Sequence, residues 1–353
     1  MKSPESSLAT QVFRQYRRCA MTSTLRPQPD SEVSAATRTA PVRVTISDPT
    51  LIRRQRMLSL LFNGIPLCGA LACIPVAIYW GFDGFDLGLF VFMYVTSFFG
   101  IEGAYHRYLA HRAFKTGQRT RFVLAVLGAF AAQGPAAFWV ANHRRHHQYT
   151  DTELDTHSPW FDENGAVSGI RGLWHAHVGW SFGNRYVNVS AFAADLLRDP
   201  LIAFVTRYYL VWVLLGLAIP TLASFVWSGM WEGALKGFLL AGLARIWFVQ
   251  NGVYIVNSFC HRFGSRPFRT QEKSTNLAWL ALPTLGAAWH NNHHAFPASA
   301  TTQVEWWQLD LTGSIIRALG VIGLAWEIRT TGQAFIDSKR QSTDNTSVVS
   351  EEH

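Results

Sequence analysis

The sequence predicts an all-α integral membrane protein in which four transmembrane helices carry a cytosolic helical cap with a histidine-rich metal site. Three observations support this architecture. Of the 353 residues, 49% are hydrophobic and only 15% are charged, whereas soluble domains are roughly 25% charged. Long apolar runs reach the length of about 20 residues that a bilayer requires. Nine of the thirteen histidines fall in four short clusters that border these runs.

Four apolar segments are long enough to cross a membrane, and they form two hairpins. They are Met57–Trp80, Phe85–Tyr105, Leu201–Trp227 and Trp231–Val256. A turn without Lys or Arg joins the first pair, as expected on the outer face of a membrane. A tight Ser-Gly-Met turn joins the second pair. Arg245 lies inside the last segment and requires a partner within the bundle, which the sequence does not identify.

Three other apolar runs are predicted to be cap or interfacial helices rather than spans. If Phe122–Val140 crossed the membrane, the first and second histidine clusters would lie on opposite faces and could not share a site. That run also contains Gln133-Gly134-Pro135, which is unfavourable in a lipid-facing helix. Asn276–Trp289 is too short and is broken by a proline, and Ser314–Trp326 is shorter still.

The distribution of charge indicates the orientation. The formal net charge is +8, ten basic residues precede Leu58, and the segment 107–200 carries ten more. By the positive-inside rule, both termini and every histidine cluster are expected on the cytosolic side. Nucleic-acid binding is not expected, because the basic stretch has no interleaved aromatic residues. We expect a disordered basic tail over residues 1–52, a membrane domain over 53–329 and a flexible tail over 330–353.

The four cysteines show no disulfide spacing, and no secretory signal is evident near Met1, although translation could also begin at Met21.

The histidine clusters have the spacing of metal ligands. They are His106-Arg-Tyr-Leu-Ala-His111, His143-Arg-Arg-His146-His147, His290-Asn-Asn-His293-His294 and Asn257-Ser-Phe-Cys-His261. In the second and third, an i, i+3, i+4 spacing puts three histidines on one helix face. His106 and His111 are five residues apart, so we expect one at a helix end and the other in the turn beyond. A site built from imidazoles suits iron, copper or zinc.

These motifs, in this order, resemble those of the membrane-bound fatty acyl desaturases of the stearoyl-CoA/acyl-lipid Δ9 type. The resemblance runs from about Arg53 to Arg329. It also includes His177-Val-Gly-Trp180 and Arg262-Phe-Gly-Ser-Arg266-Pro, and the H-x4-H first box is typical of this branch.

The resemblance implies a di-iron enzyme (Fe2+/Fe3+) that uses O2 to introduce a cis double bond, at Δ9, into a saturated acyl chain carried on CoA or lipid. No catalytic residue is implied beyond the iron ligands. The implied ligands are His106, His111, His143, His146, His147, His261, His290, His293 and His294, with Asn257 binding through a water. Gln133 and Trp139 would shape the kink of the acyl tunnel, and Tyr254 and Arg185 would also contact the substrate.

Several positions depart from the family pattern. Gly286-Ala-Ala-Trp289 replaces the usual Gly-Glu-Gly, and Tyr254 stands where Trp is common. By the resemblance, Ala141 occupies the place of a basic residue that helps to hold coenzyme A, and Arg185 would keep part of a second basic contact. The acyl carrier (CoA, ACP or lipid), the chain length, the double-bond position and the oligomeric state therefore stay open.

Other roles follow from position. Asp151, Asp155, His157 and His175 are candidates to orient the ligating imidazoles. Because no heme domain is evident at either end, electrons are expected from a separate donor, a ferredoxin or cytochrome b5 with its reductase. Arg144, Arg145, Arg171 and Arg185 are candidates to attract such an acidic carrier. The alternatives are a histidine-box lipid or alkane hydroxylase and, from a different class, a membrane metal transporter or heme-binding protein.

Overall fold

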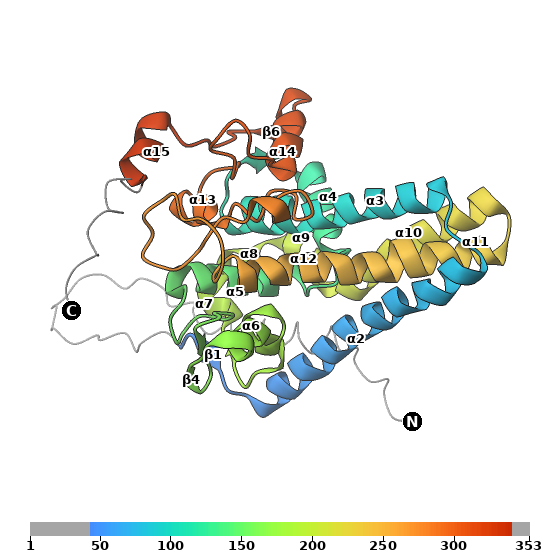
Figure 1. Cartoon of the computed structure of the whole chain (residues 1–353), viewed down its shortest axis with the longest axis horizontal. Coiled ribbons are helices and arrows are strands. Elements are labelled where there is room, and N and C mark those ends of the chain that lie inside the picture. Colours follow the sequence, from blue (N-terminus) through green and yellow to red (C-terminus); the bar gives the residue numbers. More distant parts are fainter. Residues whose placement is uncertain (1–42, 341–353) are drawn as a thin grey trace, which may run out of the picture.

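The computed structural model describes residues 43–340. Long helices form a stem, and shorter helices and loops gather at one end of it as a cap (Figure 1). In the described part of the chain, four helical segments are long and apolar enough to cross a membrane. They are Pro49–Tyr79, Gly84–Ala110, Tyr209–Ser228 and Trp231–Phe259. The protein is therefore a mostly helical membrane protein, as the sequence predicts.

Two of the four spans are composite. The second consists of α3 (Gly84–Phe99) and the π-helix η1 (Gly100–Ala110). The fourth consists of α11 (Trp231–Lys236), the π-helix η3 (Gly237–Ala244) and α12 (Arg245–Phe259). The first is the single helix α2 (Pro49–Tyr79), which contains Pro66 and Pro75.

The third span begins later than predicted. The predicted segment Leu201–Trp227 divides at Tyr208 into α9 (Pro200–Arg207) and α10 (Tyr209–Ser228). α9 buries Ile202 and Val205 and packs against α4, α5 and α8, so it belongs to the cap rather than to the apolar stem. The Ser-Gly-Met turn after α10 is present, with Gly229 in a left-handed conformation at φ 67°.

The run Phe122–Val140 does not form a span, as predicted. It divides into α4 (Gln118–Ala129) and α5 (Ala136–Tyr149), and the chain between them bends with Ala132 at φ 55° and Gly134 at φ 96°. Three polar side chains from the stem satisfy the backbone of this bend. Arg245 donates to the carbonyl of Phe130, Gln250 donates to that of Ala132, and the hydroxyl of Tyr209 accepts from the N–H of Gly134.

Arg245, whose partner the sequence does not identify, is held by neutral oxygens. Besides Phe130 it donates to the hydroxyl of Ser97 at 2.9 Å, the carbonyl of Gly216 at 2.7 Å and that of Ala241 at 3.2 Å. The guanidinium is completely buried. From the start of α12 it thus joins α3, α10 and η3 to the bend between α4 and α5, and each of these three helices contributes an acceptor that lipid could not provide.

The other two short runs differ from each other. Ser314–Trp326 overlaps a short cap helix, as predicted, α14 (Leu311–Val321), which is followed by strand β6 (Ala325–Trp326). For Asn276–Trp289 the prediction of a helix is wrong, because only the 3-10 turn η4 (Ala278–Leu280) and further turns occur there. Pro283 and the left-handed Leu285 and Gly286 explain why no continuous helix forms.

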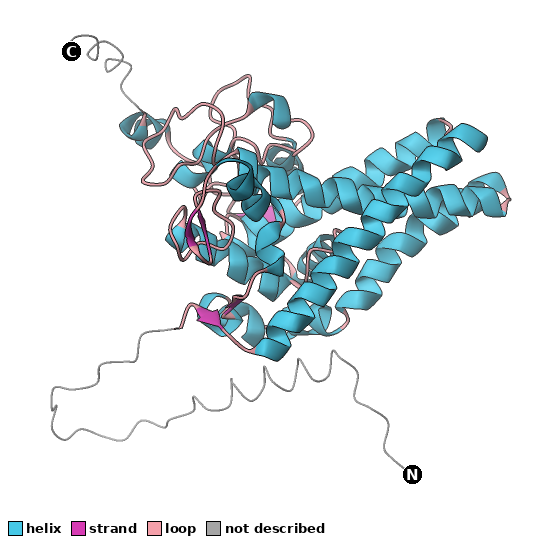
Figure 2. Ribbon diagram, turned by 60° about the horizontal axis from the view of Figure 1, so that its bottom comes forward, coloured by secondary structure: helices cyan, strands magenta, loops and turns pink. Residues whose placement is uncertain are grey.

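Small elements complete the cap. The helices are α6 (Gly169–His177), η2 (Gly179–Phe182), α7 (Val189–Phe192), α8 (Ala194–Arg198), α13 (His290–Ala295) and α15 (Gln333–Lys339). The strands pair antiparallel as β1 (Thr45–Ile46) with β5 (Tyr186–Val187), β2 (Lys115–Thr116) with β6, and β3 (Phe161–Asp162) with β4 (Gly165–Ala166). Figure 2 shows the strands at the cap end of the molecule, one of them beside the start of a long helix, where β1 leads into α2.

Both predicted tails extend partly into the structured region. β1 and the first turn of α2 lie before the predicted domain start at residue 53, and α15 lies after its predicted end at 329, with Ile336 buried. The remainder of the two predicted tails, residues 1–42 and 341–353, lies outside the described residues.

Candidate metal centre

The first histidine box lies at the end of a π-helix. In η1 the backbone N–H of His111 donates to the carbonyl of His106, five residues earlier, at 3.1 Å. Such a helix has more residues per turn than an α-helix, so side chains five apart point to the same side. His111 directly follows the helix, in the predicted position, and its ring lies 4.9 Å from that of His106. The π geometry therefore makes the H-x4-H box convergent.

The second and third boxes lie on α5 and α13, and each divides between two groups of potential ligand atoms. In both boxes, the histidines at i and i+4 share one group and the histidine at i+3 joins the other. The pair from α5 and the pair from α13 join different groups. Each group therefore receives two histidines from one of these helices and one histidine from the other. The spacing predicts that the three histidines of a box share one helix face, but it does not predict this division between two groups.

All nine predicted histidines belong to these two groups. The first group comprises His106, His111, His143, His147 and His293, and the second comprises His146, His261, His290 and His294. In the first, Nε2–Nε2 distances are 2.7 Å for His111–His143, 2.9 Å for His106–His293 and 2.9 Å for His293–His147. In the second, they are 3.0 Å for His290–His261 and 3.1 Å for His294–His290.

These distances fit shared metal ions. Imidazole nitrogens bind zinc at about 2.0–2.1 Å, and two such nitrogens at right angles around one ion are about 3 Å apart. Because two neutral imidazoles that approach through their lone pairs repel each other, the arrangement is most easily satisfied by a cation between them. The donor set, nitrogen without thiolate, suits a first-row transition metal.

The site keeps most of these histidines neutral. Burial first, and then the neighbouring histidines, lower the pKa well below its usual value for His111, His143, His147, His290, His293 and His294. A neutral imidazole retains the lone pair that binds a metal. His261 differs: burial favours its neutral form, but the charge and hydrogen bond of Asp151 outweigh burial and raise its pKa.

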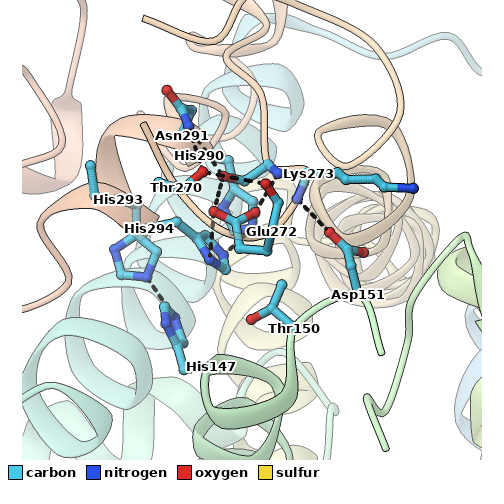
Figure 3. A network of polar contacts seen from close by, with 12 residues as sticks. His147, Thr150, Asp151, Thr270, Glu272, Lys273, His290, Asn291, His293 and His294 are labelled. Atoms are coloured by element: carbon cyan, nitrogen blue, oxygen red, sulfur yellow. Dashed lines mark hydrogen bonds and ion pairs between the residues drawn. The ribbon is translucent and has the colours of Figure 1, made fainter. Parts of the chain in front are cut away.

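Carboxylates bind the outer nitrogen of four histidines. Glu102 accepts from Nδ1 of His106 at 2.8 Å, and Asp155 from that of His146 at 2.9 Å. Asp151 accepts from Nδ1 of His261 at 3.1 Å, and Glu272 lies 3.7 Å from that of His294. Such partners fix the tautomer and the ring orientation of a ligating histidine. Figure 3 shows Glu272 beside His294, with Asp151 accepting from the backbone N–H of Lys273.

Two of these carboxylates, Asp151 and Asp155, lie at their predicted place beside the ligands, whereas Glu102 and Glu272 are not anticipated by the sequence analysis. Glu102 could have been found, because an acidic residue within a span, four positions before a box histidine, indicates a functional pairing. Glu272 carries no comparable signal, because it lies in a loop far from any box.

The two other candidates for an orienting role differ. His157 packs its ring 4.4 Å from that of His146 and, with Asp155, forms a further possible ligand group. Burial and the neighbouring His146 lower its pKa to about 3. His175 belongs to neither histidine group, and it lines a small polar cavity together with Trp180 and Arg185.

The predicted substrate residues lie in different places. Trp139 donates to Gln133 at 3.0 Å and stacks on His143 with ring centroids 5.2 Å apart, so both residues adjoin the first group. Tyr254 is buried and packs against His177 at 5.6 Å. Arg185 donates to the carbonyls of Glu153 and Glu163. Asn257, predicted to bind through a water, lies half-buried on α12, one turn before His261.

Comparison with known proteins agrees with the geometry. A family model described as "Fatty acid desaturase" matches residues 50–323. The chain is 41% identical to a hex-5-enoyl-[acyl-carrier protein] acetylenase of Moorena producens over 84% of this chain and 93% of the relative. It is 32% identical to an sn-1 stearoyl-lipid 9-desaturase of Anabaena variabilis over 81% and 98%. It is 36% identical to an acyl-CoA C20 Delta5-desaturase of Anemone leveillei over 71% and 75%.

Proposed function

The chain belongs to the fatty acid desaturase family and is an oxidoreductase that acts on fatty acyl chains, and from that premise we propose that it introduces a cis double bond, at Δ9, into a saturated acyl chain. One observation carries the proposal: nine buried or half-buried histidines converge in two adjacent groups at the cap end of the stem. The relatives of known specificity differ in position, at 9 and at Δ5, so Δ9 rests on the motifs of the first box.

We propose iron as the metal, with His106, His111, His143, His147 and His293 holding one ion and His146, His261, His290 and His294 the other. Asn257 is proposed to contribute a water-mediated contact to the second group, which has one histidine fewer. Reduced iron and O2 would supply the strong oxidant that an unactivated methylene C–H bond requires.

The protein's own contribution is positional. Glu102, Asp151 and Asp155 accept hydrogen bonds from the outer nitrogens of three ligands, and Glu272 forms a longer ion-pair contact with that of His294, so that the inner nitrogens stay aimed at the metal positions. The buried surroundings exclude water, which would otherwise compete for a reactive oxidant. Desaturation consumes O2, two electrons and two protons and releases two waters, and the electrons come from a separate donor.

The acyl chain is proposed to pass beside Trp139 and Gln133. Trp139 stacks on His143, and the small residues Ala136 and Ala137 precede it on α5 and are almost completely buried. An apolar site that selects a methylene by depth needs close packing at such positions. Tyr254 and Arg185 are proposed as further contacts nearer the carrier.

The carrier is proposed to be CoA or a lipid. Position 141, where a basic residue would contact coenzyme A, is a completely buried alanine. Arg185 remains, although two backbone carbonyls occupy its guanidinium. The relatives named above act on chains carried by acyl-carrier protein, lipid and CoA, so all three carriers belong in the assay.

We propose that the cap and both termini face the cytosol and that a soluble acidic donor, a ferredoxin or cytochrome b5, docks there. In the structure, the arginines that are candidates to attract this donor already have partners within the protein. Arg144 is bound by Asp195, Arg171 by Asp162, and Arg145 by the carbonyls of Leu154 and Asp155. Paired arginines attract an acidic partner less than free ones.

The orientation is tested by cysteine labelling of sealed vesicles, after replacement of the native cysteines. Ser168→Cys in the cap and Gly84→Cys at the opposite end of α3 are both exposed sites. We expect a membrane-impermeant reagent to label them from opposite faces. Labelling of both from one face would contradict the four-span topology.

The function is tested by expression in an auxotroph for unsaturated fatty acids, with the double-bond position determined by mass spectrometry. Growth and a Δ9 product on CoA or lipid would support the proposal. A hydroxylated product would instead indicate the hydroxylase alternative, and a product at another carbon would correct the position. Variants that bind no metal should give no product.

A further inference from the structure

A buried network of charges lies behind the first ligand group. Arg107 follows His106 on η1, and its side chain is 1% exposed. Its guanidinium donates to both carboxylate oxygens of Asp310, at 2.8 and 3.0 Å, and to Oε1 of Glu102 at 3.2 Å. The other oxygen of Glu102 accepts from His106. An unbroken chain of contacts therefore connects Asp310 to a metal-facing imidazole.

The π-helix makes this connection possible. Glu102 contacts His106 at i+4 and Arg107 at i+5 from a single carboxylate. In an α-helix the residue at i+5 would point well away from residue i, whereas an i→i+5 helix brings it close to alignment. The geometry that makes His106 and His111 converge thus also places one carboxylate between His106 and Arg107.

Asp310 is fixed in place from several directions. Besides Arg107, its carboxylate accepts from the N–H of Gly313, from the N–H of Thr302 and from the hydroxyl of Thr301, at 2.8–2.9 Å. Burial favours the protonated acid, but the charge of Arg107 and these hydrogen bonds lower the pKa of Asp310 to about 2. A Cβ on Gly286 or Gly313 would lie 2.5 Å from one of its oxygens, so neither position can carry a side chain without displacing this carboxylate.

The charges do not cancel. Two carboxylates face one guanidinium, and the Glu102 oxygen that Arg107 does not contact faces His106. Arg107 binds Asp310 at shorter distances than it binds Glu102, and so leaves an oxygen of Glu102 available to His106. Without Asp310, the guanidinium would have Glu102 as its single carboxylate partner and would draw it away from the imidazole.

We infer that Asp310, acting through Arg107 and Glu102, is a positioning residue for His106 and thereby for the first ligand group alone. Asp310 lies far from the histidine boxes in sequence, at the N-terminus of α14. The second group has its own carboxylates, Asp151, Asp155 and Glu272, none of which contacts Arg107 among the described residues. The inference rests on the proposed metal site.

The test measures the two groups separately in the full chain, purified in lipid nanodiscs. His290→Ala disables the second group, so the remaining Co2+ binding reports on the first. His111→Ala disables the first and reports on the second. Asp310→Asn is then added to each background, and the affinity for Co2+ is measured by its visible absorption.

We expect Asp310→Asn to weaken Co2+ binding roughly 10–100-fold in the His290→Ala background, the usual effect of losing an outer partner, and to leave the His111→Ala background within about threefold. Equal losses in both backgrounds, or no loss in either, would overturn the inference. If neither parent background binds Co2+, the proposed metal site itself fails.

Two further variants keep the result interpretable. Arg107→Lys has a single nitrogen that cannot bridge both carboxylates, so it should reproduce the selective loss even if Asp310→Asn does not fold. Glu305→Gln is the control. Glu305 is the carboxylate partner of Arg340, and it contacts no histidine among the described residues. Glu305→Gln should leave the Co2+ affinity of both backgrounds unchanged. A loss of affinity equal to that of Arg107→Lys would count against the inference.

Discussion

The two ligand groups share the helices α5 and α13 but are supported differently. The first has five histidines, and a carboxylate of the stem, Glu102, binds one of them. The second has four histidines, and three of them contact carboxylates of cap loops, Asp151, Asp155 and Glu272. The first group thus has more histidines and one carboxylate partner, whereas the second has fewer histidines and three carboxylate partners.

This difference indicates which parts of the fold each group depends on. Figure 3 shows that the loop carrying Glu272 and Lys273 lies over the second group, close to Asp151. The first group depends instead on η1 and on the buried network that reaches α14. Changes in the cap loop should therefore affect mainly the second group, and changes in the stem mainly the first.

Removal of a ligand should have the largest effect. His293→Ala and His290→Ala should each lower the metal content from about two ions to about one per chain and abolish turnover, because either group alone cannot complete the reaction. Each loss should exceed the roughly 10–100-fold that removal of an outer partner costs. Metal analysis and product assays measure this. Glu327→Gln serves as the control, because Glu327 is exposed and pairs with Lys115. Full metal content in His293→Ala would refute the ligand assignment.

Removal of a carboxylate in the cap should act on the second group only. Asp151→Asn removes the negative charge beside His261 and leaves a single oxygen to accept from His261 and from the N–H of Lys273. We expect Co2+ binding to fall about 10–100-fold in the His111→Ala background and little in the His290→Ala background. The opposite selectivity would show that the two groups share their supports.

Acid should release metal from the second group first. The pKa of His261 is raised above its usual value, so as pH falls a proton competes with the metal for this ligand earlier than for an ordinary histidine. In the first group, the lowered pKa of His111, His143, His147 and His293 removes such competition. Titration of Co2+ binding from about pH 8 to 5.5 in the two reporter backgrounds checks the order. Earlier loss from the first group would contradict the prediction.

Substitutions beside the first group should have the smallest effect on the metal and a visible effect on the product. Ala137→Leu adds volume one turn before Ala141 and two residues before Trp139. We expect shorter preferred chains or slower turnover, with metal content unchanged, because close-packed interiors tolerate added methylenes poorly. Chain-length profiles measure it. An unchanged profile in Ala136→Leu as well would exclude this segment from the acyl site.

Much of the site could be predicted from the sequence because its signals are local. Apolar runs of sufficient length identify spans by composition, and the second and fourth have nearly the predicted bounds, whereas the first begins at Pro49 rather than at Met57. The spacing of the boxes likewise identified all nine histidines that converge. The third span was less predictable, because nothing in the composition of Leu201–Trp227 marks the break at Tyr208.

Relations across the fold could not be read in the same way. The acceptors of Arg245 are a hydroxyl and backbone carbonyls from other helices, and carbonyls leave no signature in a sequence. The division of each box between two groups depends on how α5 and α13 face each other. Glu272 and Asp310 acquire their roles only because loops return them to the centre.

The sequence by itself therefore determined the membrane class, the nine histidines that converge and the end of the stem at which they gather, because apolar length and helical spacing act within single segments. The tertiary structure decided which histidine serves which group, which carboxylate holds it and that η1 is a π-helix. Those outcomes depend on distances of a few ångströms between segments far apart in the chain. An unpaired buried charge is strongly destabilising, so each buried charge pairs with the group that the packing brings beside it.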